Sequence, residues 1–160
     1  MEIFVTGKTT SHITATVKAA NRLLVTNDKG GWFDQGLPMQ QLRGWDSPYE
    51  TQARLRIVSS TGAFLVRMDR PLEIRNTANT AQMFRQPEVF LAAEGGERKA
   101  LAVGQDTKFQ NPPAPVAGED SIGYYRLAIS AYPPQGNFKE TAGNYIGELS
   151  LVFEPVAWVP

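Results

Sequence analysis

The stretch of sequence that decides the fold is Tyr124–Phe153, YYRLAISAYPPQGNFKETAGNYIGELSLVF. Apolar and polar residues alternate in its two halves, which are separated by a segment rich in Pro, Gly, Asn and Thr. Alternation with a period of two predicts β-strands that bury one face. The second strand lies almost at the carboxyl end, so a strand from some other part of the chain, or from another molecule, has to pair with its free edge.

The same alternation recurs along most of the 160 residues, and helical periodicity is almost absent. Eight or so short strands, separated by Gly and Pro, predict an all-β sandwich. No shift in composition marks a linker between domains. Two hairpins are expected, residues 50–58 with 64–68 and residues 88–93 with 99–103, and loops are expected at residues 30–48 and 110–118.

The composition excludes several classes of function. Sixteen basic and sixteen acidic residues leave no net charge, which predicts neither a nucleic-acid surface nor attraction to an anionic membrane. No apolar run approaches the ~20 residues of a membrane-spanning helix. The chain has no cysteine, so disulfides and thiolate zinc sites are excluded. Its start, MEIFVTGK, does not have the pattern of a signal peptide.

Candidate catalytic or metal-binding residues are few. His12 is the only histidine, and the sequence offers it no catalytic or metal-binding partner. The segment Gly7–Thr10 resembles the end of a phosphate-binding loop, but Glu2 occupies the position of the first glycine. Glu119 and Asp120 are adjacent in an expected loop, where carboxylates are usually solvated. We therefore expect no enzymatic activity, no metal and no cofactor.

Aromatic residues are concentrated in the expected loop at residues 30–48. Trp32, Phe33 and Trp45 could stack on sugar rings, which makes a carbohydrate-binding or lectin-like module an alternative hypothesis. The same rings could instead cap the open end of the sandwich, because large aromatic side chains bury roughly 150–250 Å² each. The sequence leaves both interpretations open.

The amino-terminal run is unusually long for a strand. Its alternating face consists mostly of apolar or small residues: Ile3, Val5, Gly7, Thr9, Ser11, Ile13, Ala15 and Val17. Fully extended, residues 3–17 would span about 50 Å at ~3.3 Å per residue, whereas strands usually have about 3–10 residues. Either the run divides into two strands near Gly7, or part of it projects and adds to the edge of a partner sheet.

Two segments of the carboxyl half, Leu127–Pro133 and Thr141–Val152, resemble the carboxyl end of alpha-class chaperone–usher pilins. These proteins are the major subunits of colonization-factor fimbriae, to which common-pilus subunits are related. The start is similar as well, since Ile13–Val17 followed by Leu23–Val25 matches the mature amino terminus of that family. Good matches cover about a third of the chain, and the head and tail of this chain extend beyond the family's usual limits.

The resemblance implies an incomplete immunoglobulin-like β-sandwich that is completed by donor-strand complementation. Residues 1–19 would then form a donor-strand extension and residues 20–160 the pilin domain. The implied donor residues are Ile3, Val5, Ile13, Ala15 and Val17. The implied acceptor groove lies between residues 22–26 and the last strand, and is formed by Leu23, Val25, Tyr145, Gly147, Leu149, Leu151 and Phe153.

The same resemblance implies partners and a location. Copies of the chain would join head to tail into an adhesive surface fibre, assisted by a periplasmic chaperone and an outer-membrane usher, with a tip adhesin at the end. The protein would be exported through the periplasm to the cell surface. No nucleic acid and no membrane span are expected.

Overall fold

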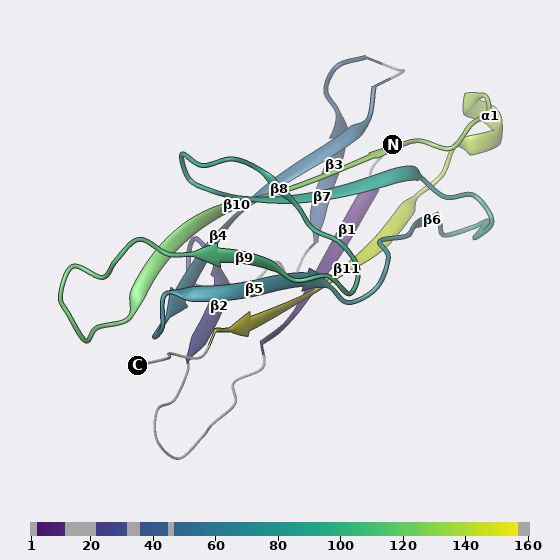
Figure 1. Cartoon of the computed structure of the whole chain (residues 1–160). Coiled ribbons are helices and arrows are strands. Elements are labelled where there is room, and N and C mark those ends of the chain that lie inside the picture. The colour runs from purple at the N-terminus through teal and green to yellow at the C-terminus, as the bar shows by residue number, and fades with distance from the viewer. Residues whose placement is uncertain (1–2, 12–21, 32–35, 45–46, 157–160) are drawn as a thin grey trace.

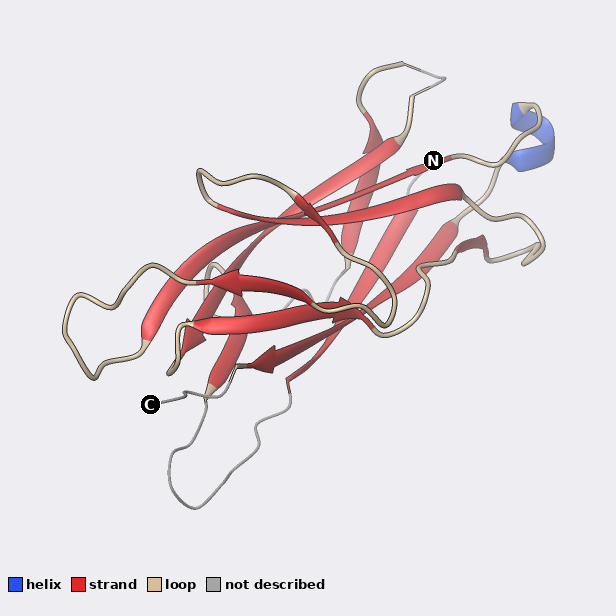
Figure 2. Ribbon diagram, viewed as in Figure 1, coloured by secondary structure: helices blue, strands red, loops and turns tan. Residues whose placement is uncertain are grey.

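The computed structural model describes residues 3–11, 22–31, 36–44 and 47–156. Within these ranges strands dominate, and a short helix precedes the last of them (Figures 1 and 2). The elements are β1 (Ile3–Ser11), β2 (Leu23–Asn27), β3 (Leu37–Gln41), β4 (Tyr49–Ser59), β5 (Ala63–Met68), β6 (Ile74–Asn76), β7 (Arg85–Ala93), β8 (Lys99–Ala100), β9 (Thr107–Gln110), β10 (Ser121–Tyr132), α1 (Phe138–Thr141) and β11 (Tyr145–Pro155). No helix among the described residues is long and apolar enough to cross a membrane.

Hydrogen bonds connect the strands in the order β8-β7-β10-β4-β3-β1-β11-β5-β9, with β2 also beside β4 and β6 also beside β11. β10 is central to the first layer, because it pairs antiparallel with β4 along one edge and with β7 along the other. β11 is central to the second layer, between β1 on one edge and β5 and β6 on the other. β1 joins the two layers, since it pairs with β11 and with β3.

The core lies between the two layers and is formed by the alternating apolar residues that the sequence pattern marks. Leu55 and Ile57 of β4 and Phe64 and Val66 of β5 are fully buried. Rings from both layers meet there: Phe64 makes an edge-to-face contact with Tyr125 of β10, at 5.4 Å between ring centroids. The all-β fold class predicted from the alternation is confirmed.

The predicted hairpin of residues 50–58 and 64–68 is wrong. β4 pairs with β10, β2 and β3, whereas β5 pairs with β11 and β9 in the other layer. The chain crosses between layers in a tight turn, in which Gly62 has a φ of 85° and its N–H donates to the Ser59 hydroxyl oxygen at 2.9 Å. Alternation shows which face of a strand is buried, but both a hairpin and such a crossing satisfy it.

Two other predictions have clear outcomes. The hairpin of residues 88–93 and 99–103 is confirmed, although only Phe90 and Leu91 have partners in β8. The predicted loop at residues 30–48 contains a strand, β3, that the sequence pattern does not reveal. β3 has only five residues, and Pro38 within it lacks the N–H that a central strand donates.

Candidate functional site: the edge of the last strand

β1 runs between the last strand and β3. Its nine residues pair in parallel with β11, from Ile3 opposite Tyr145 to Ser11 opposite Phe153. The first three also pair antiparallel with β3, where Ile3 lies opposite Met39. Figure 1 shows β1 (purple) alongside β11 (yellow). The first strand of the chain thus covers the edge of its last strand.

The opposite edge of β11 is shared by two strands. β6 pairs with its beginning, at Tyr145–Gly147, and β5 pairs with its end, at Leu151–Pro155. On the edge that faces β1, no other described strand pairs with β11. Removal of β1 would therefore leave a long edge of unpaired backbone groups beside the core, and such an edge readily pairs with another chain.

The inward face of β11 contains the five residues of this strand that the resemblance assigns to an acceptor groove: Tyr145, Gly147, Leu149, Leu151 and Phe153. All five are buried, and Tyr145 and Phe153 have no exposed surface. On β2, Leu23 is buried and Val25 is partly buried against the core. Their role in accepting a donor strand stays a prediction.

The strand across the groove differs from the expected one. The sequence predicts a groove between residues 22–26 and the last strand, but β2 pairs with β4. β3 instead provides the edge that hydrogen-bonds to β1, and its Met39 is a buried core residue. Sequence reasoning misses Met39 because β3 falls inside a segment expected to be a loop.

Several residues singled out from the sequence lie outside the described residues. Of the implied donor residues, Ile3 and Val5 belong to β1, and the others are not described. The alternative sugar-stacking hypothesis is not tested for the same reason and stays a prediction. The residues outside the described ranges are His12, Ile13, Ala15, Val17, Trp32, Phe33 and Trp45.

The Thr-Ala-Gly-Asn-Tyr segment, which contributes to the resemblance, fixes the entry into β11. The Tyr145 hydroxyl donates to the carbonyl oxygen of Thr141 at 2.8 Å. Gly143 packs so closely on Asn76 that a Cβ at this position would be 2.7 Å from the Asn76 Nδ2. Asn76 is a buried polar residue at the end of β6. Its side chain accepts from the Ala78 N–H and donates to Gln82, and sequence reasoning does not single it out.

Ion pairs stabilise the outer face of β11. Glu154 accepts a hydrogen bond from Arg67 of β5 at 2.9 Å, and Asp106 lies 3.4 Å from the same Arg67 nitrogen. The hydrogen bond to Glu154 raises the pKa of Arg67 above its usual value. Glu148 pairs with Arg70 at 3.0 Å. Because these side chains are partly exposed, solvent screens the pairs, and they contribute little to stability.

The described residues include no cluster of three or more His, Cys, Asp or Glu side chains that could hold a metal ion. The groove is lined by hydrocarbon side chains and one tyrosine, and β1 presents backbone hydrogen-bonding groups to it. Such an arrangement binds an extended polypeptide strand through main-chain hydrogen bonds and buried side chains.

Comparisons with known proteins bear on the fold. No protein-family model and no curated protein matches the chain. Among solved structures, the CooA pilin subunit from enterotoxigenic Escherichia coli is similar over 85% of this chain and 99% of its own, with a TM-score of 0.57 and 12% sequence identity. The chain has the fold of a pilin subunit. A chain of a chaperone–tip adhesin complex of CFA/I fimbriae biogenesis is also similar, over 84% of this chain and 43% of its own, with a TM-score of 0.48 and 14% identity.

Proposed function

We propose that the protein is a structural fimbrial subunit that polymerises by donor-strand exchange into an adhesive surface fibre. In this proposal, residues 1–19 are the donor extension and residues 20–160 form the pilin domain that accepts the extension of the next copy. The proposed partners are further copies of the chain, a periplasmic chaperone, an outer-membrane usher and a tip adhesin. The protein would be exported through the periplasm and act at the cell surface.

The observation that carries the proposal is the position of β1. The sandwich without β1 has an open edge along β11, directly over buried residues of the core. The strand that fills this edge is the first element of the chain, and residues 12–22 connect it to β2. A terminal strand on a connecting segment can leave its own groove and enter an equivalent groove in another copy at little cost to the rest of the fold.

Exchange of this strand would produce a fibre and not a closed pair. The donor is at the start of the chain, and the groove is formed by other elements, so the contact joins two different surfaces. A contact between different surfaces that does not close into a ring generates an open helical filament. Each added copy would bring an unfilled groove or an unused donor to the growing end.

Truncation tests the proposal. We expect the full chain to form filaments in negative-stain microscopy as its concentration rises, and the chain without residues 1–18 to form none. The truncated chain should bind a synthetic peptide of residues 1–18, because its groove is intact, and should then elute as a 1:1 complex in size exclusion. Filament growth from the truncated chain, or failure of the peptide to bind a folded truncated chain, would contradict the proposal.

A further inference from the structure

A hollow lies on the outer face of the first layer, far from the edge of β11. Its floor consists of Ala92 of β7 and Ala128 of β10, two small residues at outward positions of adjacent strands. Longer side chains surround them: Gln52 on β4, Arg126 on β10, and Arg98 after the turn at Gly95–Gly96. The hollow exists because small residues replace the long side chains that cover the rest of this face.

The hollow carries a surplus of positive charge. Arg126 lies directly opposite Arg54 across β10 and β4, and like charges in such positions destabilise a sheet. Glu94, which also lines the hollow, accepts hydrogen bonds from Arg54 at 2.6 and 3.2 Å and is attracted more weakly by Arg126. Within the described residues, Arg98 and Arg126 have no ion pair. Arg98 and Arg126 therefore border the hollow and Arg54 lies beside it, so three guanidinium groups share the one carboxylate of Glu94 in a chain that has no net charge.

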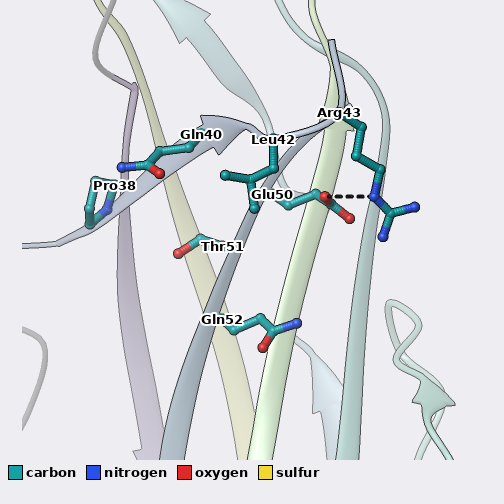
Figure 3. A pocket seen from close by; sticks show the side chains of 7 residues that line it. All are labelled: Pro38, Gln40, Leu42, Arg43, Glu50, Thr51 and Gln52. Atoms are coloured by element: carbon teal, nitrogen blue, oxygen red, sulfur yellow. Dashed lines mark ion pairs between the residues drawn. The ribbon is translucent and has the colours of Figure 1, made fainter. Parts of the chain in front are cut away.

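The hollow continues across the layer as a polar trough. Gln52 also lines the adjoining depression at β3 and β4, which Figure 3 shows. There Thr51 and Gln40 offer hydroxyl and amide groups, while Arg43 and Glu50 form an ion pair at 3.7 Å. From β7 to β3 the trough crosses three strand spacings, about 14 Å at roughly 4.8 Å each. One end of the trough is thus positive, and the other is polar without surplus charge.

We propose that this trough binds an acidic oligosaccharide, with a carboxylate or sulfate group held between Arg98 and Arg126. Planar guanidinium groups bind such anions through paired, charge-assisted hydrogen bonds. The uncharged sugars of the ligand lie over Ala128 and along Gln52, whose amide can both donate and accept hydrogen bonds to hydroxyl groups. Another carboxylate, Glu88, lies opposite Ser130 and lines the same depression as Arg98, but not the hollow that Arg126 borders.

The chemistry of the trough favours a saccharide over other anions. A peptide that binds by strand addition would need a free strand edge, and the trough lies on the face of a sheet whose central strands are already paired. A peptide bound only through acidic side chains is the alternative that the oligoglutamate probe tests. A nucleic acid would need a long basic surface to follow its phosphates, whereas the surplus here is confined to one hollow. The anion site is separate from strand exchange, because neither Arg98 nor Arg126 belongs to the groove of β11, although the far end of the trough reaches Pro38 of β3, which pairs with Phe4 of β1.

Binding of the purified full chain to immobilised oligosaccharides tests the proposal. The probes are a sulfated oligosaccharide, a carboxylated one and an uncharged one of equal length, together with an oligoglutamate peptide. Arg126→Gln should weaken binding of the acidic saccharide about tenfold or more, the effect of one lost charge-assisted hydrogen bond. Arg22→Gln is the control, because it removes the same charge from an arginine that pairs with Asp120 elsewhere in the layer.

Two further measurements separate binding from structure. Ala128→Leu should abolish binding without a change in charge, because the added side chain fills the trough. The melting temperature of Arg126→Gln should stay nearly equal, since the lost repulsion from Arg54 and the lost attraction to Glu94 oppose each other. Preference for the sulfated or for the carboxylated probe identifies the anion, and either preference supports the proposal. Equal binding of the uncharged probe, equal binding of oligoglutamate, or equal loss in Arg22→Gln would overturn it.

Discussion

At the residue scale, a polar cluster inside the sandwich determines how the two layers meet. The Tyr125 hydroxyl donates to Asn111 Oδ1 at 2.7 Å, and the Asn111 amide nitrogen donates to the carbonyl oxygen of Ile57 at 2.9 Å. Both side chains are buried. Gly123 makes room for the cluster, because a Cβ there would overlap Asn111. Tyr125 is therefore both an apolar core ring and a hydrogen-bond donor.

Tyr125→Phe should destabilise the fold by about 1–3 kcal/mol, because it leaves the buried Asn111 Oδ1 without its donor. The measurement is chemical denaturation followed by intrinsic fluorescence. Tyr132→Phe, at an exposed position of the same strand, is the matched control and should change stability by less than about 0.5 kcal/mol. Equal stability of both variants would show that the cluster does not stabilise the fold.

The same tyrosine predicts a loss of stability in alkali. Burial raises the pKa of Tyr125 to about 12, whereas an unfolded tyrosine has a pKa of about 10. Its contribution is therefore complete below pH ~10 and declines as the pH rises toward ~12. Denaturation across this range should show a steeper decline for the wild-type chain than for Tyr125→Phe. Parallel declines in the two proteins would contradict the assignment.

Gly147 is required in β11 for reasons of space. Its φ does not lie in the left-handed region, but a Cβ would be 2.7 Å from Ile74 Cγ1 and 2.9 Å from the carbonyl oxygen of Glu73. Gly147→Ala should therefore cost about 1–3 kcal/mol in the free energy of unfolding. Gly31→Ala, where the nearest atom would be 3.6 Å away, is the control, and both variants can be compared by thermal denaturation. Equal melting temperatures would contradict the close contact with β6.

Sequence reasoning at this scale succeeds where a residue's environment follows from its own strand. Alternation alone predicts that Leu149 and Leu151 face inward, and both are buried. It does not predict Asn76 or Asn111 as buried polar residues. Asn111 is held by Ile57, which is close only in the folded chain, and Asn76 is held by Ala78 and Gln82 nearby in the sequence as well as by the distant Ala142. A buried asparagine has no pattern of its own in the sequence.

At the scale of elements, the pairing of β1 with β11 can be tested by a disulfide. Phe4 lies opposite Ile146, whose side chain is 47% exposed, and the native chain has no cysteine. Strand neighbours are about 4.8 Å apart, within the range that a disulfide spans. Oxidised Phe4→Cys/Ile146→Cys, prepared at low concentration, should form an intramolecular bond and migrate as a monomer on a non-reducing gel.

The control for this cross-link places the second thiol in the other layer. Ile122 is also exposed, at 43%, but belongs to β10. Phe4→Cys/Ile122→Cys should therefore form no intramolecular disulfide. If the first variant gave only intermolecular products at low concentration, β1 would pair with another copy and not with its own β11.

The elements also show what a sequence pattern leaves undetermined. Both β4 and β5 are predicted from alternation, but their partners are not, because a register of alternating residues fits any neighbour with a complementary apolar face. β3 is not predicted at all, since five residues with one proline carry too little pattern. The groove could therefore be inferred from the sequence on its β11 side and not on its β3 side.

At the scale of the whole molecule, closure of the groove within one chain has a consequence for stability. The end of β1 and the start of β2 lie at the same end of the sandwich. Ser11, at the end of β1, is opposite Phe153, which pairs with β5. Leu23, at the start of β2, is opposite Ser59, and the turn after Ser59 leads into β5. A connection between nearby ends favours insertion of β1 in the parallel direction. A donor from another copy has no such constraint, and antiparallel pairing is slightly more stable per residue.

Closure within the chain predicts how the melting temperature depends on concentration. At dilutions where size exclusion shows a monomer, the melting temperature of the full chain should not change with protein concentration, because β1 is part of the same molecule. The chain without residues 1–18 should melt at a lower temperature, and addition of a peptide of residues 1–18 should raise that temperature. At a peptide concentration of a hundred times its dissociation constant, the free energy of unfolding should increase by about 2.7 kcal/mol. A peptide carrying Val5→Asp is the control and should have a much weaker effect, because Val5 is one of the proposed donor residues and a charge at a donor position would have to be buried in the groove. A melting temperature of the full chain that rises with its own concentration would mean that β1 is exchanged between copies even in dilute solution, because only intermolecular pairing responds to mass action.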